Sequence, residues 1–309
     1  MDQAEAFLMS MNHPAYAVIT PVRDEGRYLK STIDSMVEQQ LTPVVWIIVD
    51  DGSTDNSAAI IREYAAFHPW IILKQTERNS PRLTGSAEIQ AFNFGLTFLQ
   101  EVDFDFIVKL DADLSFDSGY FADLISRFAT NPKLGIASGV YAEKTGEEWL
   151  PVRMPDYHAA GASKVIRASC FRQMGGFIPF RGWDTVDEIK AMYLGWETTH
   201  FPDLIFRHLK NEGTGMGWLG TTIMHGEIYY RTTGGGYVFF ALKVASRMVS
   251  GNPILLNGIA LLYGYIKTWV TRKPLLVSRA EANHYRKLLN RRLRPAWLSG
   301  NTLTPVKSL

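Results

Sequence analysis

The chain of 309 residues is 46% hydrophobic, 20% charged and 12% aromatic, which is the composition of a globular protein with a sizeable core. It excludes a disordered chain, a collagen and a simple coiled coil, and the length predicts about two domains. A single cysteine, Cys170, excludes an intramolecular disulfide and fits a reducing compartment. The N-terminal residues lack the basic and apolar pattern of a secretory signal.

The net charge of +1 conceals an uneven distribution. Residues 228–309 contain 13 lysines and arginines and one acidic residue, Glu281, for a net charge of +12, so residues 1–227 carry −11. A basic segment of this kind favours polyanionic partners, either nucleic acid or anionic lipid headgroups. Because no nucleic-acid-binding motif accompanies the charge, we expect no nucleic-acid partner.

Short apolar runs alternate with stretches of helical period in the first half of the chain. β-branched and aromatic residues predict strands there, and apolar residues spaced by three or four predict helices. The alternation indicates an α/β fold with βαβ crossovers and a Rossmann-like, mostly parallel sheet flanked by helices, in which ligands bind beyond the carboxyl ends of the strands. The expected strands cover residues 16–20, 44–49, 70–73 and 104–110, and the expected helices cover 28–40, a segment capped by Asp55 or Asn56, 88–99 and 118–128.

The second half of the chain predicts a different organisation. A glycine-rich segment begins near residue 213, and we place a domain boundary there, between an α/β domain, residues 1–212, and a basic helical region, residues 213–309. Before that boundary we expect strands at 135–141 and 163–169, a short helix at 184–194 and an extended segment at 198–201.

Two segments of the basic region raise the question of membrane contact. Residues 254–266 contain one polar side chain in thirteen, but a spanning helix needs about 20 apolar residues. Residues 237–248 combine apolar residues with Lys243 and Arg247 in an amphipathic pattern. The basic region therefore either packs against the first domain or makes peripheral contact with an anionic membrane.

Polar side chains follow two strands at the edge where the sheet is expected to bind ligands. In VDDGSTDN, residues 49–56, adjacent carboxylates end an apolar strand, and buried carboxylates need donors such as a nucleobase N–H or a ribose hydroxyl. In VKLDADL, residues 108–114, Asp111 and Asp113 point to the same side of an extended chain. Two carboxylates so placed suit a hard cation such as Mn²⁺ or Mg²⁺.

A further group of carboxylates begins the expected helix at 184–194. Asp184, Asp187 and Glu188 share one helical face, because residues three or four apart are neighbours, and one of them is a candidate general base. The alternative is an acidic helix N-terminus stabilised by the helix dipole. The preceding Trp183 either offers a flat face to an acceptor sugar or packs in the core.

Together with ITPVRDEGRYL at residues 19–29, these segments resemble glycosyltransferase family 2, which has the GT-A fold. The resemblance implies that Pro21, Arg23 and Glu25 belong to the nucleotide-binding site, although the family's usual Pro-x-Tyr-Asn-Glu motif is altered, with arginine and aspartate in the Tyr and Asn places. It also implies that Asp51 contacts the base.

The same resemblance assigns the metal site. In the DAD motif, Asp111 lies at the nucleotide and Asp113 is the direct metal ligand. A late histidine often completes such a site, and His208 is similarly placed, with His225 as a weaker candidate.

The family's Glu-Asp motif precedes a helix that ends in Gly-Trp. Counting back from that pair at residues 195–196 places the two acids at Trp183 and Asp184, so the first acid is lost. The resemblance therefore implies Asp184 as the base, and Asp187 stays as an alternative. In the polar stretch after the third strand, Arg78 or Arg82 either holds the diphosphate or is a solvated loop residue.

The resemblance implies a metal-dependent inverting glycosyltransferase that moves a sugar from a nucleoside-diphosphate sugar, with UDP as the expected carrier. The basic region is similar to those of some bacterial family 2 enzymes of surface-polysaccharide assembly. It favours a glycan or lipid-linked glycan acceptor and a cytoplasmic location, peripheral on the inner face of the membrane. Two alternatives stay open: a sugar nucleotidyltransferase, or a non-catalytic, membrane-associated nucleotide-binding protein.

Overall fold

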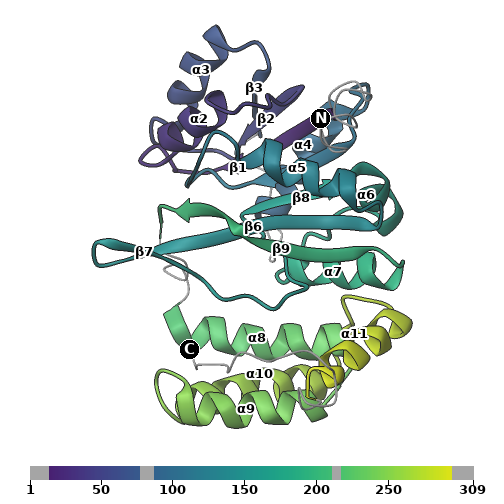
Figure 1. Cartoon of the computed structure of the whole chain (residues 1–309). Coiled ribbons are helices and arrows are strands. Elements are labelled where there is room, and N and C mark those ends of the chain that lie inside the picture. The colour runs from purple at the N-terminus through teal and green to yellow at the C-terminus, as the bar shows by residue number, and fades with distance from the viewer. Residues whose placement is uncertain (1–13, 77–86, 211–216, 294–309) are drawn as a thin grey trace. The chain divides into compact units, whose positions relative to one another are not determined.

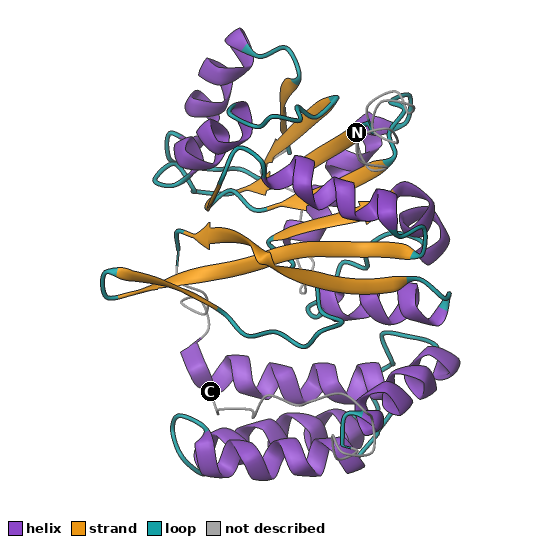
Figure 2. Cartoon of the chain, viewed as in Figure 1, coloured by secondary structure: helices purple, strands orange, loops and turns teal. Residues whose placement is uncertain are grey.

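The computed structural model describes residues 14–76, 87–210 and 217–293. The chain divides into two compact units, Met1–Asn211 and Glu212–Leu309, which we call the α/β unit and the helical unit. Strands and helices alternate in the first unit, and the described part of the second consists of helices and their connections (Figure 1, Figure 2). The expected α/β architecture is confirmed.

The α/β unit is built on one sheet of nine strands among the described residues. Its order is β3-β2-β1-β4-β8-β6-β9-β5, and β7 pairs with β6 outside this path. The first four strands of that order are parallel, whereas β8 runs antiparallel to β4 and β6. The strands are β1 (Tyr16–Val22), β2 (Val45–Asp50), β3 (Ile71–Gln75), β4 (Phe106–Leu110), β5 (Leu114–Phe116), β6 (Leu134–Thr145), β7 (Glu148–Pro151), β8 (Ser163–Arg167) and β9 (Glu197–His208).

Helices cover both faces of this sheet. Successive residues of a strand point to opposite sides, and apolar residues of β1 are buried on both sides. Tyr16 and Val18 belong to one buried cluster with α2, α3 and α5, whereas Ala17 and Ile19 belong to another with α4, α6 and α7. The sheet therefore separates two apolar cores. The helices are α2 (Leu29–Val37), α3 (Ser57–Phe67), α4 (Ala87–Leu96) with a 3₁₀ turn at Thr97–Leu99, α5 (Tyr120–Thr130), α6 (Ala168–Met174) and α7 (Trp183–Tyr193).

The expected extended segment at 198–201 is part of a much longer strand. β9 covers twelve residues, pairs with β6 in parallel, and changes register between Gly139 and Val140 of that partner. Its carboxyl end pairs antiparallel with β5, so that His208 lies opposite Leu114. This pairing carries the end of β9 to the segment that contains Asp113.

The helical unit contains α8 (Gly217–Thr233), α9 (Val238–Ser250), α10 (Leu256–Val270) and α11 (Arg279–Arg291). Glycines allow α8 and α10 to pack closely: a Cβ added to Gly264 would lie 2.0 Å from the carbonyl oxygen of Ile223. Aromatic rings join α8, α9 and α10, with Phe240 stacked on Tyr265 at 4.3 Å between centroids. Among the described helices, none has the length and apolar character that a bilayer crossing requires.

Candidate active site

Two loops at the carboxyl edge of the sheet hold each other in place. The Asp24 carboxylate accepts a hydrogen bond from the backbone N–H of Thr54 at 2.6 Å, and the Asp55 carboxylate accepts one from Gly26 at 2.8 Å. The two loops approach closely here, because a Cβ at Gly26 would lie 2.0 Å from the Asn56 side-chain oxygen, which would have to move. The loop that follows β1 is therefore fixed against the loop that follows β2.

The two carboxylates that end β2 have different environments. Asp50 is buried, and its oxygens accept from the Ser53 N–H at 2.8 Å and from the Gln75 side chain at 2.9 Å. Asp51 is half-buried and accepts from the Thr76 hydroxyl at 2.7 Å. The more accessible Asp51 is thus the one that is open to a ligand.

The remaining residues expected at the nucleotide lie in different environments, and two of them are outside the described residues. Pro21 lies in β1 opposite Val49 of β2, and Arg23 is exposed near Asp24, at 3.8 Å between charged atoms. Arg78 and Arg82 lie outside the described residues. Their expected contact with a diphosphate stays a prediction.

Three side chains of the types that ligate metals converge beyond β4. Asp111, Asp113 and His208 each offer a ligand atom, and these atoms lie within 4.8 Å of one another. His208 Nε2 is 3.3 Å from Asp113 Oδ2, although the two residues are 95 positions apart. Two carboxylates fit Mn²⁺ or Mg²⁺, which prefer oxygen ligands, and the additional imidazole favours Mn²⁺, which is a transition metal. His225, the weaker candidate, lies in α8 of the helical unit.

Glu25 lies near this cluster and is held by a lysine that follows β9. Lys210 Nζ is 2.6 Å from its carboxylate. Burial raises the pKa of Glu25, and repulsion from Asp113 adds to the rise, while Lys210 opposes it. The Glu25–Lys210 pair thus joins the first loop to the end of β9, beside the candidate metal ligands.

Two lysines, Lys109 and Lys164, are buried in the strands next to the site. Neither of them was assigned a role from the sequence. Lys109 of β4 and Lys164 of β8 are direct cross-strand partners, and both are almost inaccessible to solvent. Like charges in that position repel each other, so each ammonium needs its own carboxylate. Lys109 forms a very short ion pair with Asp111, which places a fixed positive charge behind the first acid of the DAD motif. A lysine within an otherwise apolar strand is the signal that could have identified them.

Trp183 lies against both lysines. Their Nζ atoms are 5.1 Å and 5.3 Å from its ring, and its Nε1 donates to Glu88 at 2.6 Å. Its side chain is only 6% exposed and packs edge-on against Phe177. Of the two expected roles, core packing is the one that this geometry favours, and contact with an acceptor stays an untested prediction.

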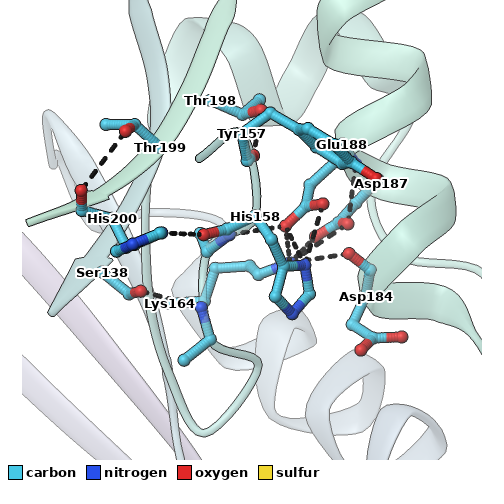
Figure 3. Close-up of polar contacts among 12 residues, drawn as sticks. Ser138, Tyr157, His158, Lys164, Asp184, Asp187, Glu188, Thr198, Thr199 and His200 are labelled. Carbon is cyan, nitrogen blue, oxygen red and sulfur yellow. Dashed lines mark hydrogen bonds and ion pairs between the residues drawn. The ribbon is translucent and has the colours of Figure 1, made fainter. Parts of the chain in front are cut away.

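Lys164 is the centre of a buried ionic cluster that also contains Asp187, Glu188 and His158 (Figure 3). Its Nζ is 2.9 Å from Asp187 Oδ2 and 3.3 Å from Glu188 Oε1, and His158 Nδ1 is 3.0 Å from Glu188 Oε1. Burial raises the pKa of Asp187 to about 7, against the attraction of Lys164. Burial alone would lower the pKa of His158, but Glu188 outweighs it and the pKa is raised.

Asp184 begins the same helix but points elsewhere. Its backbone carbonyl accepts from Lys164 at 3.0 Å, while its carboxylate is turned away from the ammonium (Figure 3). Asp184 is partly exposed, whereas Asp187 is 1% exposed. The two candidate bases are therefore distinct: one carboxylate is open, and the other is committed to an ion pair.

Comparison with known sequences gives one family match. The family model described as Glycosyl transferase family 2 matches residues 17–182, which is more than half of the chain. Among curated proteins, the 4,4'-diaponeurosporenoate glycosyltransferase of Staphylococcus aureus strain MRSA252 is 38% identical over 64 residues. That match covers 21% of this chain and 17% of the relative, so the chain spans less than a fifth of the length of the curated relatives it matches.

Comparison with solved structures shows the fold. The mannosyltransferase PcManGT from Pyrobaculum calidifontis, in complex with GDP-Man and Mn²⁺, is similar with a TM-score of 0.54 and 16% identity, over 96% of this chain and 88% of that one. GalNAc-T7 with UDP, GalNAc and Mn²⁺ is similar with a TM-score of 0.53 and 15% identity, over 72% and 51% of the two chains. Both similarities support the GT-A fold.

Proposed function

Because the chain belongs to glycosyl transferase family 2, we propose that it transfers a sugar from a nucleoside-diphosphate sugar to a hydroxyl acceptor. The observation that carries the proposal is the convergence of Asp111, Asp113 and His208 within 4.8 Å after β4, at the same edge of the sheet as the Asp51 carboxylate that follows the parallel strand β2. Both similar structures are complexes that contain a nucleotide or nucleotide sugar together with Mn²⁺, which supports a donor of that class here.

We place the divalent cation on Asp113 and His208, with Asp111 beside it. Bound there, Mn²⁺ or Mg²⁺ would supply a positive charge that stabilises the departing diphosphate. Lys109 holds the Asp111 carboxylate from behind and so fixes its position at the donor. Asp51 is assigned to the base, and UDP is the proposed carrier.

Asp184 is the proposed general base. An acceptor hydroxyl is a weak nucleophile at neutral pH, and a carboxylate within hydrogen-bond reach removes its proton as it attacks. The carboxylate of Asp184 is turned away from Lys164, whereas that of Asp187 is neutralised by it. A single displacement by the activated hydroxyl inverts the anomeric centre, and the proton passes to Asp184.

The acceptor we propose is a hydroxyl of a glycan or lipid-linked glycan at the cytoplasmic face of a membrane. Charge supports this location, because residues 228–309 carry a net charge of +12. A nucleotidyltransferase is less well supported, since such enzymes usually carry a glycine-rich basic loop after the first strand, where this chain has TPVRDEGR.

Donor turnover tests the proposal. The purified chain is incubated with UDP-, GDP-, dTDP- and CDP-sugars and Mn²⁺ or Mg²⁺, with water accepting the sugar in place of the glycan, and release of the nucleoside diphosphate is measured. We expect turnover with one donor, only with metal, and its loss in Asp113→Ala while the folded structure is retained. Full activity of that variant would overturn the metal assignment, and release of pyrophosphate from a nucleoside triphosphate would favour the nucleotidyltransferase alternative.

A further inference from the structure

Helix α10 exposes a continuous apolar stripe. Five large apolar side chains recur every three or four residues along it, so they share one face, and each is between 42% and 68% exposed. The close packing of Gly264 against Ile223 places α8 on the opposite side of the helix. The stripe therefore faces away from α8 and consists of Leu256, Ile259, Tyr263, Ile266 and Val270.

The stripe continues through the connection to α9. Ile254 and Leu255 are 66% and 58% exposed, and the N–H of Leu256 donates to the Ile254 carbonyl at 2.7 Å. Leu255, the centre of this tight turn, has a φ of +60°, which is unfavourable for a leucine. On α9, Val238, Leu242 and Val249 are also exposed, at helical spacing. The tip of the α9–α10 hairpin thus presents apolar side chains at a cost in backbone strain.

Positive charge accompanies this apolar surface. No acidic residue occurs between residues 228 and 280, and Lys243 and Lys267 are exposed on α9 and α10. Beyond the end of α10, a cavity of about 520 Å³ is lined by four basic side chains together with the exposed Trp269. The basic residues are Arg272, Lys273, Arg279 and Arg286.

We propose that the α9–α10 hairpin docks this surface onto an anionic lipid membrane. Apolar side chains would enter the boundary between headgroups and acyl chains, and the arginines of the cavity would bind lipid phosphates. A second copy of the chain is a poor occupant, because it would bring two positively charged surfaces together. This inference rests on the proposed function, and it names the surface through which the enzyme would bind the membrane that holds its acceptor. Vesicle binding is measured without donor or acceptor, so membrane binding can fail while glycosyl transfer is retained, and the reverse.

Co-sedimentation with vesicles tests the proposal. The full chain is mixed with pure phosphatidylcholine vesicles or with vesicles that also contain phosphatidylglycerol, at low and at high salt. We expect binding to the anionic vesicles that weakens with salt. The double variant Ile259→Ser, Ile266→Ser should bind about tenfold more weakly or worse, because it removes two inserted apolar side chains. Arg272→Gln with Arg279→Gln should weaken binding by about tenfold.

A matched control separates this surface from exposed apolar residues in general. Phe67 on α3 is 79% exposed, and Phe67→Ser should leave vesicle binding unchanged. All of these side chains are accessible, so the variants should unfold at the same temperature as the original chain.

Three results would overturn the proposal. The first is absence of binding to anionic vesicles at low salt. The second is a dimer in sedimentation velocity that the α10 double variant converts to a monomer, since this would assign the stripe to self-association. The third is full displacement from vesicles by inorganic phosphate with normal binding by the α10 variant, since this would assign the cavity to soluble phosphates.

Discussion

Two acids on one helix, Asp184 and Asp187, differ in what they can do. Asp187 forms an ion pair with the buried Lys164, whereas the Asp184 carboxylate points away from that ammonium. We expect Asp184→Asn to lower the turnover number about a hundredfold or more with little change in stability, because it removes a proton acceptor. Initial-rate kinetics and urea denaturation check both parts.

The matched change at the second acid, Asp187→Asn, should mainly lower stability rather than the turnover number. Asp187→Asn leaves Lys164 with less negative charge in the core, and breaking a buried ion pair costs about 3 kcal/mol of unfolding free energy. If this variant were as stable as the original chain but inactive, Asp187 rather than Asp184 would be the base.

His158 makes stability depend on pH. Its pKa is raised by Glu188 in the folded chain, so the folded state binds the proton more tightly than the unfolded state does. The stabilisation is therefore complete below the unfolded pKa of about 6.5 and is lost as pH rises through the folded pKa. We expect the urea midpoint to fall between about pH 6 and about pH 8, and to fall less in His158→Gln.

Part of that pH dependence should remain in His158→Gln. Asp187 also has a raised pKa, of about 7, so its proton too is lost from the folded state as pH rises. Both groups act in the same direction. A midpoint in His158→Gln that falls as steeply as in the original chain would show that His158 does not take up the proton.

At the scale of elements, the strands were predictable and their lateral order was not. Apolar runs that end in acidic residues marked β2 and β4, because the sequence changes abruptly from apolar to acidic residues at Asp50 and Asp111. The order β4-β8-β6-β9 depends on pairings between distant segments, which no local pattern encodes. The antiparallel strands β8 and β6 were expected as strands, but their places beside β4 were not.

In the candidate site too, some residues could be predicted from the local sequence and others depend on strand pairing. Asp51, Asp111 and Asp113 follow buried strands, so their grouping at one edge could be argued from the residues. His208 came only from the family resemblance, because its approach to Asp113 depends on the pairing of β9 with β5. Lys109 and Lys164 were missed because their meeting is a matter of cross-strand register.

The packing of α4 on the sheet gives a prediction at this scale. Alanine at Gly95 would favour the helix by about 1 kcal/mol on propensity alone. Its Cβ, however, would lie 2.8 Å from Ile19 and 2.9 Å from Val49, both stiff branched side chains of the core. Overpacking of this kind costs about 1–3 kcal/mol, so we expect Gly95→Ala to lower the urea midpoint.

Gly119 provides the control for that change. Its nearest neighbour to an added Cβ is 3.5 Å away, which is ordinary contact, and its φ is −86°. Gly119→Ala should therefore change the unfolding free energy by less than about 0.5 kcal/mol. Equal stabilities of the two variants would show that α4 moves outward without cost.

At the scale of the whole molecule, charge and chemistry are divided between the units. The α/β unit, residues 1–211, carries a net charge of −9 and contains the candidate metal ligands and bases, while the helical unit, residues 212–309, carries +10 and contains the apolar α9–α10 surface. A cation and a nucleotide suit the first unit, and an anionic surface suits the second. Each unit should therefore respond to its own ligand.

Hydrogen exchange can test this division. A nucleoside diphosphate with Mn²⁺, at about 100 times its dissociation constant, adds about 2.7 kcal/mol to the stability of the unit that binds it. Amides of β1 and β4 that exchange through unfolding of the α/β unit should then slow about a hundredfold. Anionic vesicles should instead slow the amides of α9 and α10.

Asp113→Ala separates the two responses. It should abolish the metal-dependent protection of β1 and β4 and leave the vesicle response of α9 and α10 intact, because Asp113 lies in the α/β unit and provides a candidate ligand atom. Metal-dependent protection that survives in this variant would contradict the assignment of Asp113. Protection of β1 and β4 by vesicles alone would place the lipid-binding surface on the α/β unit and contradict its assignment to α9 and α10.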